Sequence, residues 1–426
     1  MEASRELVEP SPRPGVAGGD PVPIAIADGT AQKTDPAETP RQRRSRIVAE
    51  LKWPFLVYLA SRVLLAVVAF IAVLIGRVVI GHASYSHAMA NWDGKWYLLA
   101  VRHGYPAYPS HAQTTLGFLP LYPMVMWALA HVLFVPYVVA GVLVSLVGGF
   151  VAVVLTQRLA TRWWDAATGR RAVLFFCAFP GSVVFSMMYS EGLLIPLAMG
   201  CLLALGRRRW LLAGVLSAFA TAAGPDALVL VPVCAVAAAL EIHRRGWRDR
   251  SARRSLIAPV LAPMGLAGFG IFLWAWTGTP LASYEAQRYG WGEKSDPFAI
   301  LNQTHILAMQ FVNVFRKTSL PHQGIDLNLI AGEIGAAFLV YGLVVMWRYR
   351  SAIPIEAWVW TLGISMLVVT SEFVPPNARM LLTAFPLLYA VAHHFTGRRF
   401  TRLMTTAAIL LVVMSDLTFV GFTLRP

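Results

Sequence analysis

Long apolar runs, separated by short polar or basic segments, make up most of the chain after about residue 54. A helix that crosses a bilayer needs roughly 20 predominantly apolar residues. On this length we predict eleven membrane-spanning helices, near 54–80, 137–157, 171–187, 190–206, 210–223, 226–242, 256–276, 328–347, 354–371, 379–395 and 403–423. The fold class that this pattern predicts is an all-α polytopic membrane protein.

The apolar run at 117–134 either crosses the membrane or lies beside it. Pro120 and Pro123 weaken a regular helix in its first turns, because proline lacks an amide hydrogen. If the run does not cross, the arginine clusters all fall on one side of the membrane; they lie at 158–171, 207–209, 244–254, 348–350 and 398–402. Cytoplasmic loops carry an excess of Lys and Arg. We therefore predict that 117–134 is extracytoplasmic or half-inserted, with a cytoplasmic N-terminus and an outer C-terminus.

Residues 1–45 are rich in Pro, Gly, Ala and Asp and lack hydrophobic periodicity. Such segments bury too little apolar surface to fold, so we predict a disordered cytoplasmic tail. A basic stretch from Arg41 to Lys52 precedes the first apolar run, which fits a cytoplasmic start. The remainder, 46–426, is predicted to be one transmembrane domain.

Composition supports the membrane interpretation. The chain is 57% hydrophobic and 14% charged, whereas soluble domains carry about 25% charged residues. Its net charge of +14 lies in clusters beside apolar runs, so we expect contact with membrane lipids and not with nucleic acid. The three cysteines lie inside apolar runs and follow no metal-ligand spacing. We predict no metal and no cofactor.

Polar residues gather in the segments that this topology places outside. They are the loop 81–136 with NWDGKWY, YSE at 189–191, GPD at 224–226, the loop 277–327, and SEFVPPNAR at 371–379. Polar groups concentrated at one membrane face indicate a site there. Asp93 is the first candidate, and its carboxylate could cap a helix, serve chemistry, or do both.

The residues WDGKWYLLAVRHGYP, followed by GFLPLYPMVMWAL, resemble the opening signature of the PIG-V family of mannosyltransferases. Three further segments resemble that family in the same order: AFPGSVVFSMMYSEGLL, YEAQRYGWG and NARMLLTAFPLLYA. The resemblance implies a GT-C membrane glycosyltransferase with juxtamembrane helices in its first outer loop. It also implies a donor sugar carried on a polyprenyl phosphate, with Asp93 as the acidic residue near the reaction centre.

The chemistry of such a transfer can be stated from the reacting groups. An acceptor hydroxyl attacks the anomeric carbon, and a carboxylate can act as its base or orient it. The leaving lipid phosphate needs cations or hydrogen-bond donors. Arg379 is the first choice, because arginine can bind phosphate through two donors and because it matches the family segment. It could instead be an anchor at the membrane surface.

We assign the other candidates by their positions in these segments. The expected donor-binding residues besides Arg379 are Lys95, Tyr97, Arg102, Tyr122 and Arg288. The expected acceptor-binding or sugar-binding residues are Tyr189, Glu191, Gln287 and Trp291. Glu191 could equally cap its helix, and the aromatic loop could be an interfacial anchor.

Two features depart from the resemblance. Family members often carry Arg-Pro where this chain has Gly224-Pro225, followed by Asp226, which removes one expected cation. The first outer loop also holds one acidic residue and no Asp-x-Asp pair, so a divalent metal is not indicated.

The predicted activity is α-mannosyl transfer from polyprenyl-phosphate mannose to a glycolipid or lipoglycan acceptor. We expect it at the outer face of a bacterial plasma membrane. A transporter or lipid flippase is the alternative, and a scaffold without activity is a third. Transporters tend to carry charges in mid-membrane and repeated halves, whereas the predicted spans carry few charges apart from Arg62, and no repeat is evident.

Overall fold

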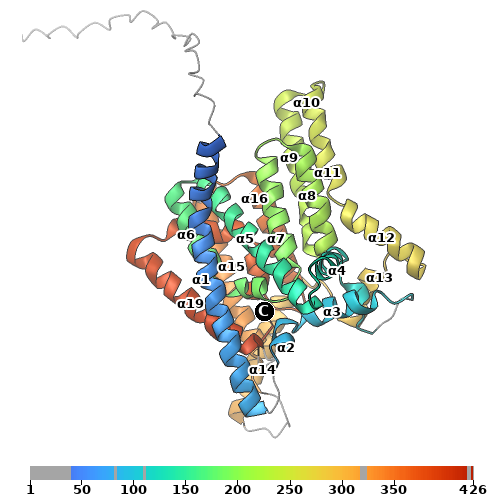
Figure 1. Ribbon diagram of the computed structural model, residues 1–426, viewed down its shortest axis with the longest axis vertical. Helices are drawn as coiled ribbons and strands as arrows, with labels where there is room; N and C mark the ends of the chain where they lie inside the picture. The colour runs from blue at the N-terminus through green and yellow to red at the C-terminus, as the bar shows by residue number, and fades with distance from the viewer. Residues whose placement is uncertain (1–39, 81–83, 109–111, 317–323, 420–423, 426) are drawn as a thin grey trace, which may run out of the picture. The chain divides into compact units, whose positions relative to one another are not determined.

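The computed structural model describes residues 40–80, 84–108, 112–316, 324–419 and 424–425. Over these residues it contains nineteen α-helices and no β-strand (Figure 1). The chain divides into units of residues 1–48 and 49–426. The predicted tail falls outside the described residues up to residue 39, and helix α1 begins at Pro40. The predicted domain boundary at residue 45 stays a prediction.

Five helical segments are long and apolar enough to cross a membrane, and two bent pairs raise that number to seven among the described residues. The five are α1 (Pro40–Ile80), α5 (Tyr137–Trp163), η3 (Pro225–Val229) with α9 (Leu230–Arg245), α15 (Leu327–Arg348) and α19 (Gly397–Phe419). The bent pairs are η2 (Pro180–Ser186) with α7 (Glu191–Leu205), and α10, η4 and α11 (Arg250–Leu261) with α12 (Met264–Thr277). The protein is therefore an all-α polytopic membrane protein, as predicted, while the number of eleven spans stays a prediction.

The remaining apolar helices are shorter. They are α4 (Leu121–Leu133), α6 (Ala166–Ala178), α8 (Trp210–Ala223), α16 (Ile355–Thr370), α17 (Ala378–Thr383) and α18 (Phe385–His394). Helix α4 has 13 residues, which gives about 20 Å at 1.5 Å per residue. Because the hydrocarbon core is about 30 Å thick, α4 is too short to cross it as a straight helix.

Two predicted spans are interrupted at proline. Over 171–187, helix α6 ends at Ala178 and the chain continues as the 3₁₀-helix η2, which begins at Pro180. Over 379–395, α17 ends at Thr383, and Ala384 separates it from α18. Proline removes an amide donor and disfavours helical geometry at the residue before it. The spans were predicted from the lengths of apolar runs, and such lengths do not show where proline interrupts a helix.

The two long loops that were predicted to lie outside also contain helices. The first holds α2 (Tyr85–Met89), α3 (Asp93–His103), the turn η1 (Thr115–Gly117) and α4. The second holds α13 (Ala282–Glu285), the π-helical turn η5 (Ala286–Gly290) and α14 (Ala299–Arg316). The helices expected in the first loop are thus present, whereas those of the second were treated in the sequence only as a loop.

Helix α5 packs against both α6 and α7, and α7 packs against α8. Helix α18 contacts both α6 and α15. Helices α5 and α7 approach unusually closely at two glycines. A Cβ atom on Gly148 would lie 1.6 Å from the carbonyl oxygen of Gly192. One turn earlier on α5, Ser145 Oγ donates to the carbonyl of Tyr189 at 3.1 Å. The glycine contact and this hydrogen bond together hold the start of α7 and the residues just before it against α5.

Buried Arg62 of α1 explains how η2 keeps its place. Its Nη1 donates to the Ser182 carbonyl at 2.7 Å and to Ser186 Oγ at 3.0 Å. Its Nη2 donates to Ser182 Oγ at 3.1 Å. The charge noted within the first span is thus bound to the backbone and hydroxyls of η2.

The Gly148–Gly192 contact can be tested by adding one methyl group. Gly148→Ala must separate the two helices or distort them, and such overpacking costs about 1–3 kcal/mol. We expect a lower thermal unfolding midpoint for the purified variant in detergent. Gly268→Ala on α12 is the matched control, since its added Cβ would meet no atom within 4 Å. An unchanged midpoint for Gly148→Ala would mean that the helices are not in this contact.

Candidate active site

Asp93 is the first residue of α3 and follows a turn with unusual backbone geometry. Trp92 has φ of 54°, a value that a bulky side chain rarely adopts and that costs about 1–3 kcal/mol. The Asn91 side chain stabilises the turn: its Oδ1 accepts from the Trp92 amide at 2.9 Å, and its Nδ2 donates to the Thr418 carbonyl at 2.9 Å. The loop that contains Asp93 is thereby fixed to α19, with the Asp93 side chain 35% exposed.

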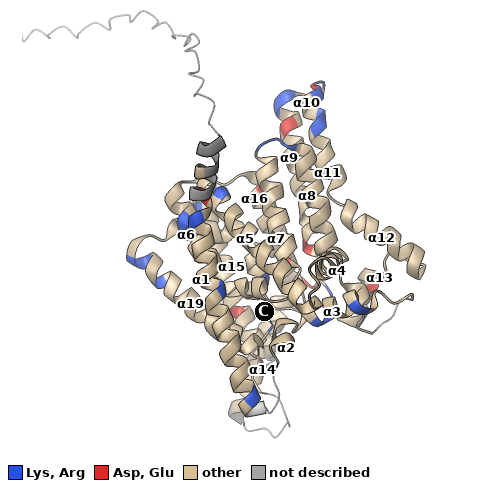
Figure 2. Cartoon of the chain, viewed as in Figure 1, with Lys and Arg blue, Asp and Glu red and all other residues tan. Residues whose placement is uncertain are grey.

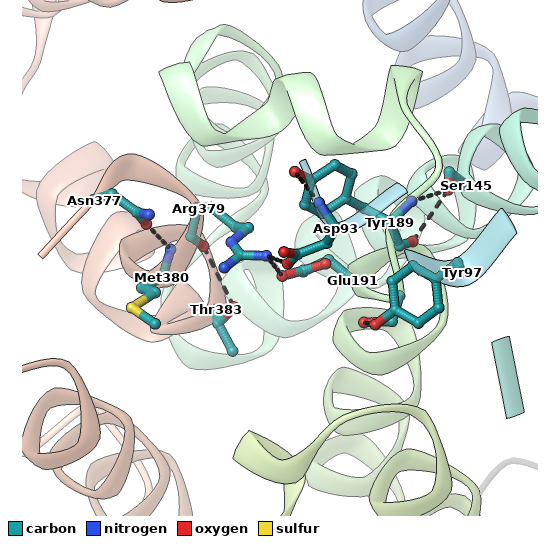
Figure 3. Close-up of polar contacts among 10 residues, drawn as sticks. Asp93, Tyr97, Ser145, Tyr189, Glu191, Asn377, Arg379, Met380 and Thr383 are labelled. Carbon is teal, nitrogen blue, oxygen red and sulfur yellow. Dashed lines mark hydrogen bonds and ion pairs between the residues drawn. The ribbon is translucent and has the colours of Figure 1, made fainter. Parts of the chain in front are cut away.

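Arg379 joins Asp93 to Glu191. Figure 3 shows its side chain reaching from α17 toward both carboxylates. Arg379 Nη1 donates to Asp93 Oδ2 and lies 3.4 Å from Glu191 Oε1. The guanidinium carbon lies 5.4 Å from the centre of the Tyr189 ring, in a cation–π contact. Since a guanidinium remains charged in proteins, one cation lies between two acidic side chains.

The position of Arg379 follows from local contacts around α17. Asn377 caps this helix, its Oδ1 accepting from the Met380 amide at 3.0 Å. On the side of η2, a Cβ atom on Gly181 would lie 2.1 Å from the Ala378 carbonyl oxygen. Glycine at 181 thus lets η2 lie directly against the start of α17, which places Arg379 close to Tyr189.

Buried hydroxyl groups hold the Tyr189–Glu191 segment. Tyr97 donates to Ser190 Oγ at 2.8 Å, and the Asp93 amide donates to the Tyr189 hydroxyl at 3.3 Å. Tyr122 donates to the Gly141 carbonyl at 2.9 Å, and its hydroxyl lies 2.9 Å from Ser145 Oγ. Burial, with Glu191 and Asp93 nearby, raises the pKa of Tyr97 well above its ordinary value. Tyr97 therefore stays neutral and positions its neighbours.

A cavity of about 180 Å³ opens beside this ion contact. Its lining residues are Trp92, Asp93, Lys95, Trp96, Gln113, Tyr189, Trp291, Phe373, Val374, Asn377, Arg379 and Arg425. Carboxylate, cations, amides and aromatic faces therefore meet around one space. Such a set can bind a polyhydroxylated or anionic ligand against flat apolar surfaces.

Five of the eleven predicted site residues line the cavity: Asp93, Lys95, Tyr189, Trp291 and Arg379. Glu191 lies directly behind them, in contact with Arg379. Exposed Lys95 has its Nζ 5.4 Å from the Trp96 ring centre, and Trp291 packs edge-on against Trp96 at 5.1 Å. Their assigned roles as ligands of donor or acceptor stay predictions.

The other five predicted residues do not line the cavity. Tyr97 and Tyr122 are buried in the hydroxyl network, and Gln287 Nε2 donates to the Gly117 carbonyl at 2.7 Å. Arg102 is exposed at the far end of α3. Arg288 is exposed as well, with its Nη1 donating to the Tyr284 hydroxyl at 3.1 Å. Donor binding by these residues would require a ligand that extends beyond the cavity.

Several lining residues were not anticipated from the sequence. Asn377 lies two residues before Arg379, in the segment NARMLLTAFPLLYA that resembles the family. The sequence could therefore have identified it as a candidate. Arg425 belongs to no recognisable motif, and nothing in the local sequence marks it. Gly224 lies near the site, since a Cβ atom there would be 2.5 Å from Leu194 Cδ1 and 4.0 Å from Ser190 Oγ.

Within the described part of the chain, no three His, Cys, Asp or Glu side chains come together in a group that could hold a metal ion.

The site and the arginine clusters lie at opposite ends of the same helices. Helix α7 begins at Glu191 and ends at Leu205, just before Arg207–Arg209. Its 15 residues span about 22 Å. Helix α9 follows Asp226 and ends at Arg245, and Figure 2 shows the basic residues of α9 and α10 at the far end from α3.

These observations define a polytopic helical membrane protein with a charged, partly buried site at one end of its helices. The family model for Mannosyltransferase (PIG-V) matches residues 56–268, which is half of the 426 residues. The chain therefore belongs to the mannosyltransferase (PIG-V) family, which confirms the resemblance. The matched range includes Asp93 and Glu191 and ends before Arg379.

Comparison with solved structures gives weak likenesses. The apo oligosaccharyltransferase of Archaeoglobus fulgidus has a TM-score of 0.45 and 12% identity, covering 84% of this chain and 56% of that chain. The archaeal oligosaccharyltransferase AglB from the same organism, in complex with an inhibitory peptide and a dolichol-phosphate, has a TM-score of 0.43 and 11% identity, covering 85% and 56%. The chain thus spans little more than half the length of these proteins. No curated protein sequence matches the chain.

Removal of the Arg379 cation tests the ion contact. Arg379→Gln leaves two carboxylates near each other, with the Glu191 side chain only 11% exposed. Breaking a buried ion pair from one side costs about 3–5 kcal/mol, and the partial exposure of Asp93 favours the lower end. We expect a clearly lower unfolding midpoint in detergent.

A double variant distinguishes charge imbalance from lost packing. Arg379→Gln with Glu191→Gln removes the buried carboxylate that the first change leaves without a counter-charge. We expect this variant to regain part of the lost stability. If it unfolds at the same temperature as Arg379→Gln or below, the carboxylate–arginine contact is not what stabilises the site.

Proposed function

We propose that this mannosyltransferase moves mannose from a polyprenyl-phosphate-mannose donor to a hydroxyl of a glycolipid or lipoglycan acceptor. The observation that carries the proposal concerns the two oxygens of Asp93. Oδ2 accepts from Arg379, while Oδ1 has no protein partner among the described residues and belongs to a partly exposed side chain on the cavity. Asp93 is thus held in one orientation with one oxygen available to a substrate.

The proposed reaction is a single displacement. The acceptor oxygen attacks the anomeric carbon as its proton passes to Asp93 Oδ1, and the bond from that carbon to the phosphate oxygen breaks. Both electrons of that bond remain on the phosphate, which leaves as polyprenyl phosphate. A positioned base of this kind contributes about 10²–10⁴-fold to rate. Displacement inverts the anomeric centre, so a β-linked donor gives an α-mannoside.

The cavity walls support a sugar ligand. Trp96 and Trp291 present aromatic surface on the same space as Asp93, and flat rings of this kind suit the C–H faces of a hexose. Glu191, whose Oε2 is buried without a partner among the described residues, is proposed to orient the sugar or acceptor from behind Arg379. Lys95 and Arg379 supply positive charge near the expected phosphate.

The arginine clusters support an extracytoplasmic site. They follow the ends of α7 and α9 that lie away from Glu191 and Asp226. Because Lys and Arg are enriched in cytoplasmic loops, the opposite ends, with Asp93, are proposed to face outward in a bacterial plasma membrane. A lipid-borne donor and acceptor could then reach the site within the plane of the bilayer.

The catalytic role of Asp93 is tested by Asp93→Asn. Asparagine has nearly the same size and shape as aspartate but cannot accept the proton, so we expect the purified enzyme to lose transfer by about 10²–10⁴-fold. Helix capping does not confuse the result, because Trp92 is the N-cap of α3 and Asp93 makes no capping hydrogen bond among the described residues. Activity is measured as mannose incorporation into acceptor lipid and release of polyprenyl phosphate. Asp165→Asn is the matched control, because Asp165 caps α6 by accepting from the Thr168 amide. Wild-type turnover by folded Asp93→Asn would remove Asp93 from the mechanism.

The proposed orientation is tested by cysteine labelling in intact cells. The native Cys177, Cys201 and Cys234 are buried, so a new exposed cysteine should dominate labelling by a membrane-impermeant maleimide. We expect Lys95→Cys to react without permeabilisation and Arg250→Cys to react only after it. The reverse pattern would place the site in the cytoplasm and exclude the proposed reaction.

A further inference from the structure

The cavity brings three cations near one carboxylate, but their charges are not equally available. Arg379 already contacts Asp93 and Glu191. If both carboxylates are ionised, this group of three carries a net negative charge. An anionic ligand would therefore gain little from Arg379 alone, and its attraction to the cavity depends on the other two cations. Lys95 is exposed, whereas Arg425 is held by several contacts in the cavity wall.

We propose that Arg425 and Asn377 form the subsite that holds the phosphate of the lipid-linked donor. This inference rests on the proposed function and adds to it the residues that bind the leaving group. Arg425 reaches the cavity from the far C-terminal part of the chain, whereas Asn377 reaches it from the segment before α17.

Arg425 is a fixed cation without a carboxylate partner among the described residues. Its Nη1 donates to the Phe373 carbonyl at 3.1 Å. Its guanidinium carbon lies 4.6 Å from the Phe373 ring centre and 5.7 Å from the Trp92 ring. Its amide donates to Asn328 Oδ1 at 2.8 Å. Aromatic rings and one carbonyl thus hold the planar group while leaving several of its five donors for a ligand.

Asn377 supplies a neutral donor on the same cavity. Its Oδ1 is used by the helix cap on Met380. The Asn377 side chain is buried, since the residue is only 5% exposed. Its Nδ2 has no hydrogen-bond partner among the described residues. A buried amide donor without a partner is costly, and a phosphate oxygen in the cavity would satisfy it.

The unusual backbone of Trp92 fits this arrangement. Trp92 precedes Asp93 directly, and its ring contacts the Arg425 guanidinium. The strained turn therefore positions two adjacent groups at once: the Asp93 carboxylate and the Trp92 ring that contacts Arg425. The phosphate gains negative charge as the sugar leaves, so a cation fixed here acts more strongly in the transition state than in the bound donor.

The subsite can be measured through binding, without turnover. We would titrate the full-length protein in nanodiscs with polyprenyl phosphate, followed by quenching of tryptophan fluorescence. Loss of a charge-assisted contact in Arg425→Gln should weaken binding by about tenfold or more. It should also raise the KM for polyprenyl-phosphate mannose and leave the KM for acceptor unchanged. Arg425→Lys should fall between Arg425→Gln and wild type.

Arg350→Gln is the matched control. Arg350 also stacks on an aromatic ring, with its guanidinium carbon 5.1 Å from the Trp347 ring centre, and donates to the Trp347 carbonyl at 3.4 Å. It does not line the cavity, so we expect wild-type binding. Asn377→Ser is the second test, because serine keeps the cap but removes the amide donor without adding a charge. Its polyprenyl phosphate affinity should fall with little change in its unfolding midpoint.

The results separate this inference from the proposed function. Equal affinity of Arg425→Gln, Arg350→Gln and wild type for polyprenyl phosphate would overturn the subsite, even if Asp93→Asn abolished transfer. Binding that depends on Arg425 in a protein that transfers no mannose would support the subsite and contradict the proposed reaction. Absence of binding to the wild-type protein would overturn the subsite directly.

Discussion

The contact of Arg379 with Asp93 and Glu191 joins three helices that begin far apart in the sequence. Asp93 starts α3, Glu191 starts α7, and Arg379 lies in the first turn of α17. Without the cation, two acidic groups would lie together in a partly buried space, which is unfavourable. The same contact orients one oxygen of Asp93 and leaves the other open to the cavity. The stability of the site and its chemistry therefore depend on one guanidinium.

Interrupted helices supply the polar backbone and side chains that a continuous span would not provide. The breaks before Pro180 and around Ala384 end regular hydrogen bonding near the same region. Irregular backbone is tolerated at membrane depth where protein surrounds it or water reaches it. Here Arg62 and the close approach at Gly181 enclose η2. At the second break, Trp360 Nε1 donates to the Thr383 carbonyl at 2.9 Å. Both breaks are therefore stabilised by specific side-chain contacts with the backbone.

Much of the site could be predicted because polar tripeptides stand out between apolar runs. Asp93, Glu191 and Arg379 were all identified, and the helical membrane fold was confirmed. The interruption of two spans was missed, because apolar content does not report where proline ends a helix. Tyr97 and Tyr122 were predicted to bind the donor, and their burial in hydrogen bonds was not foreseen. Sequence does not distinguish a tyrosine facing a cavity from one facing a neighbouring helix, and the donor role of these residues stays a prediction. Nothing in the local sequence identified Arg425 as a site residue, because its placement depends on tertiary contacts with Phe373, Trp92 and Asn328.

The link from Asn91 to the Thr418 carbonyl also has a consequence for biosynthesis. As the chain leaves the ribosome, Asp93 and Glu191 are synthesised well before Arg379, and Thr418 follows later still. During this interval both acidic groups lack their counter-charge, and the turn at Trp92 lacks its anchor. The ion contact and the turn can therefore form only after the C-terminal helices have been synthesised. Completion of the site is consequently a late step in the folding of the chain.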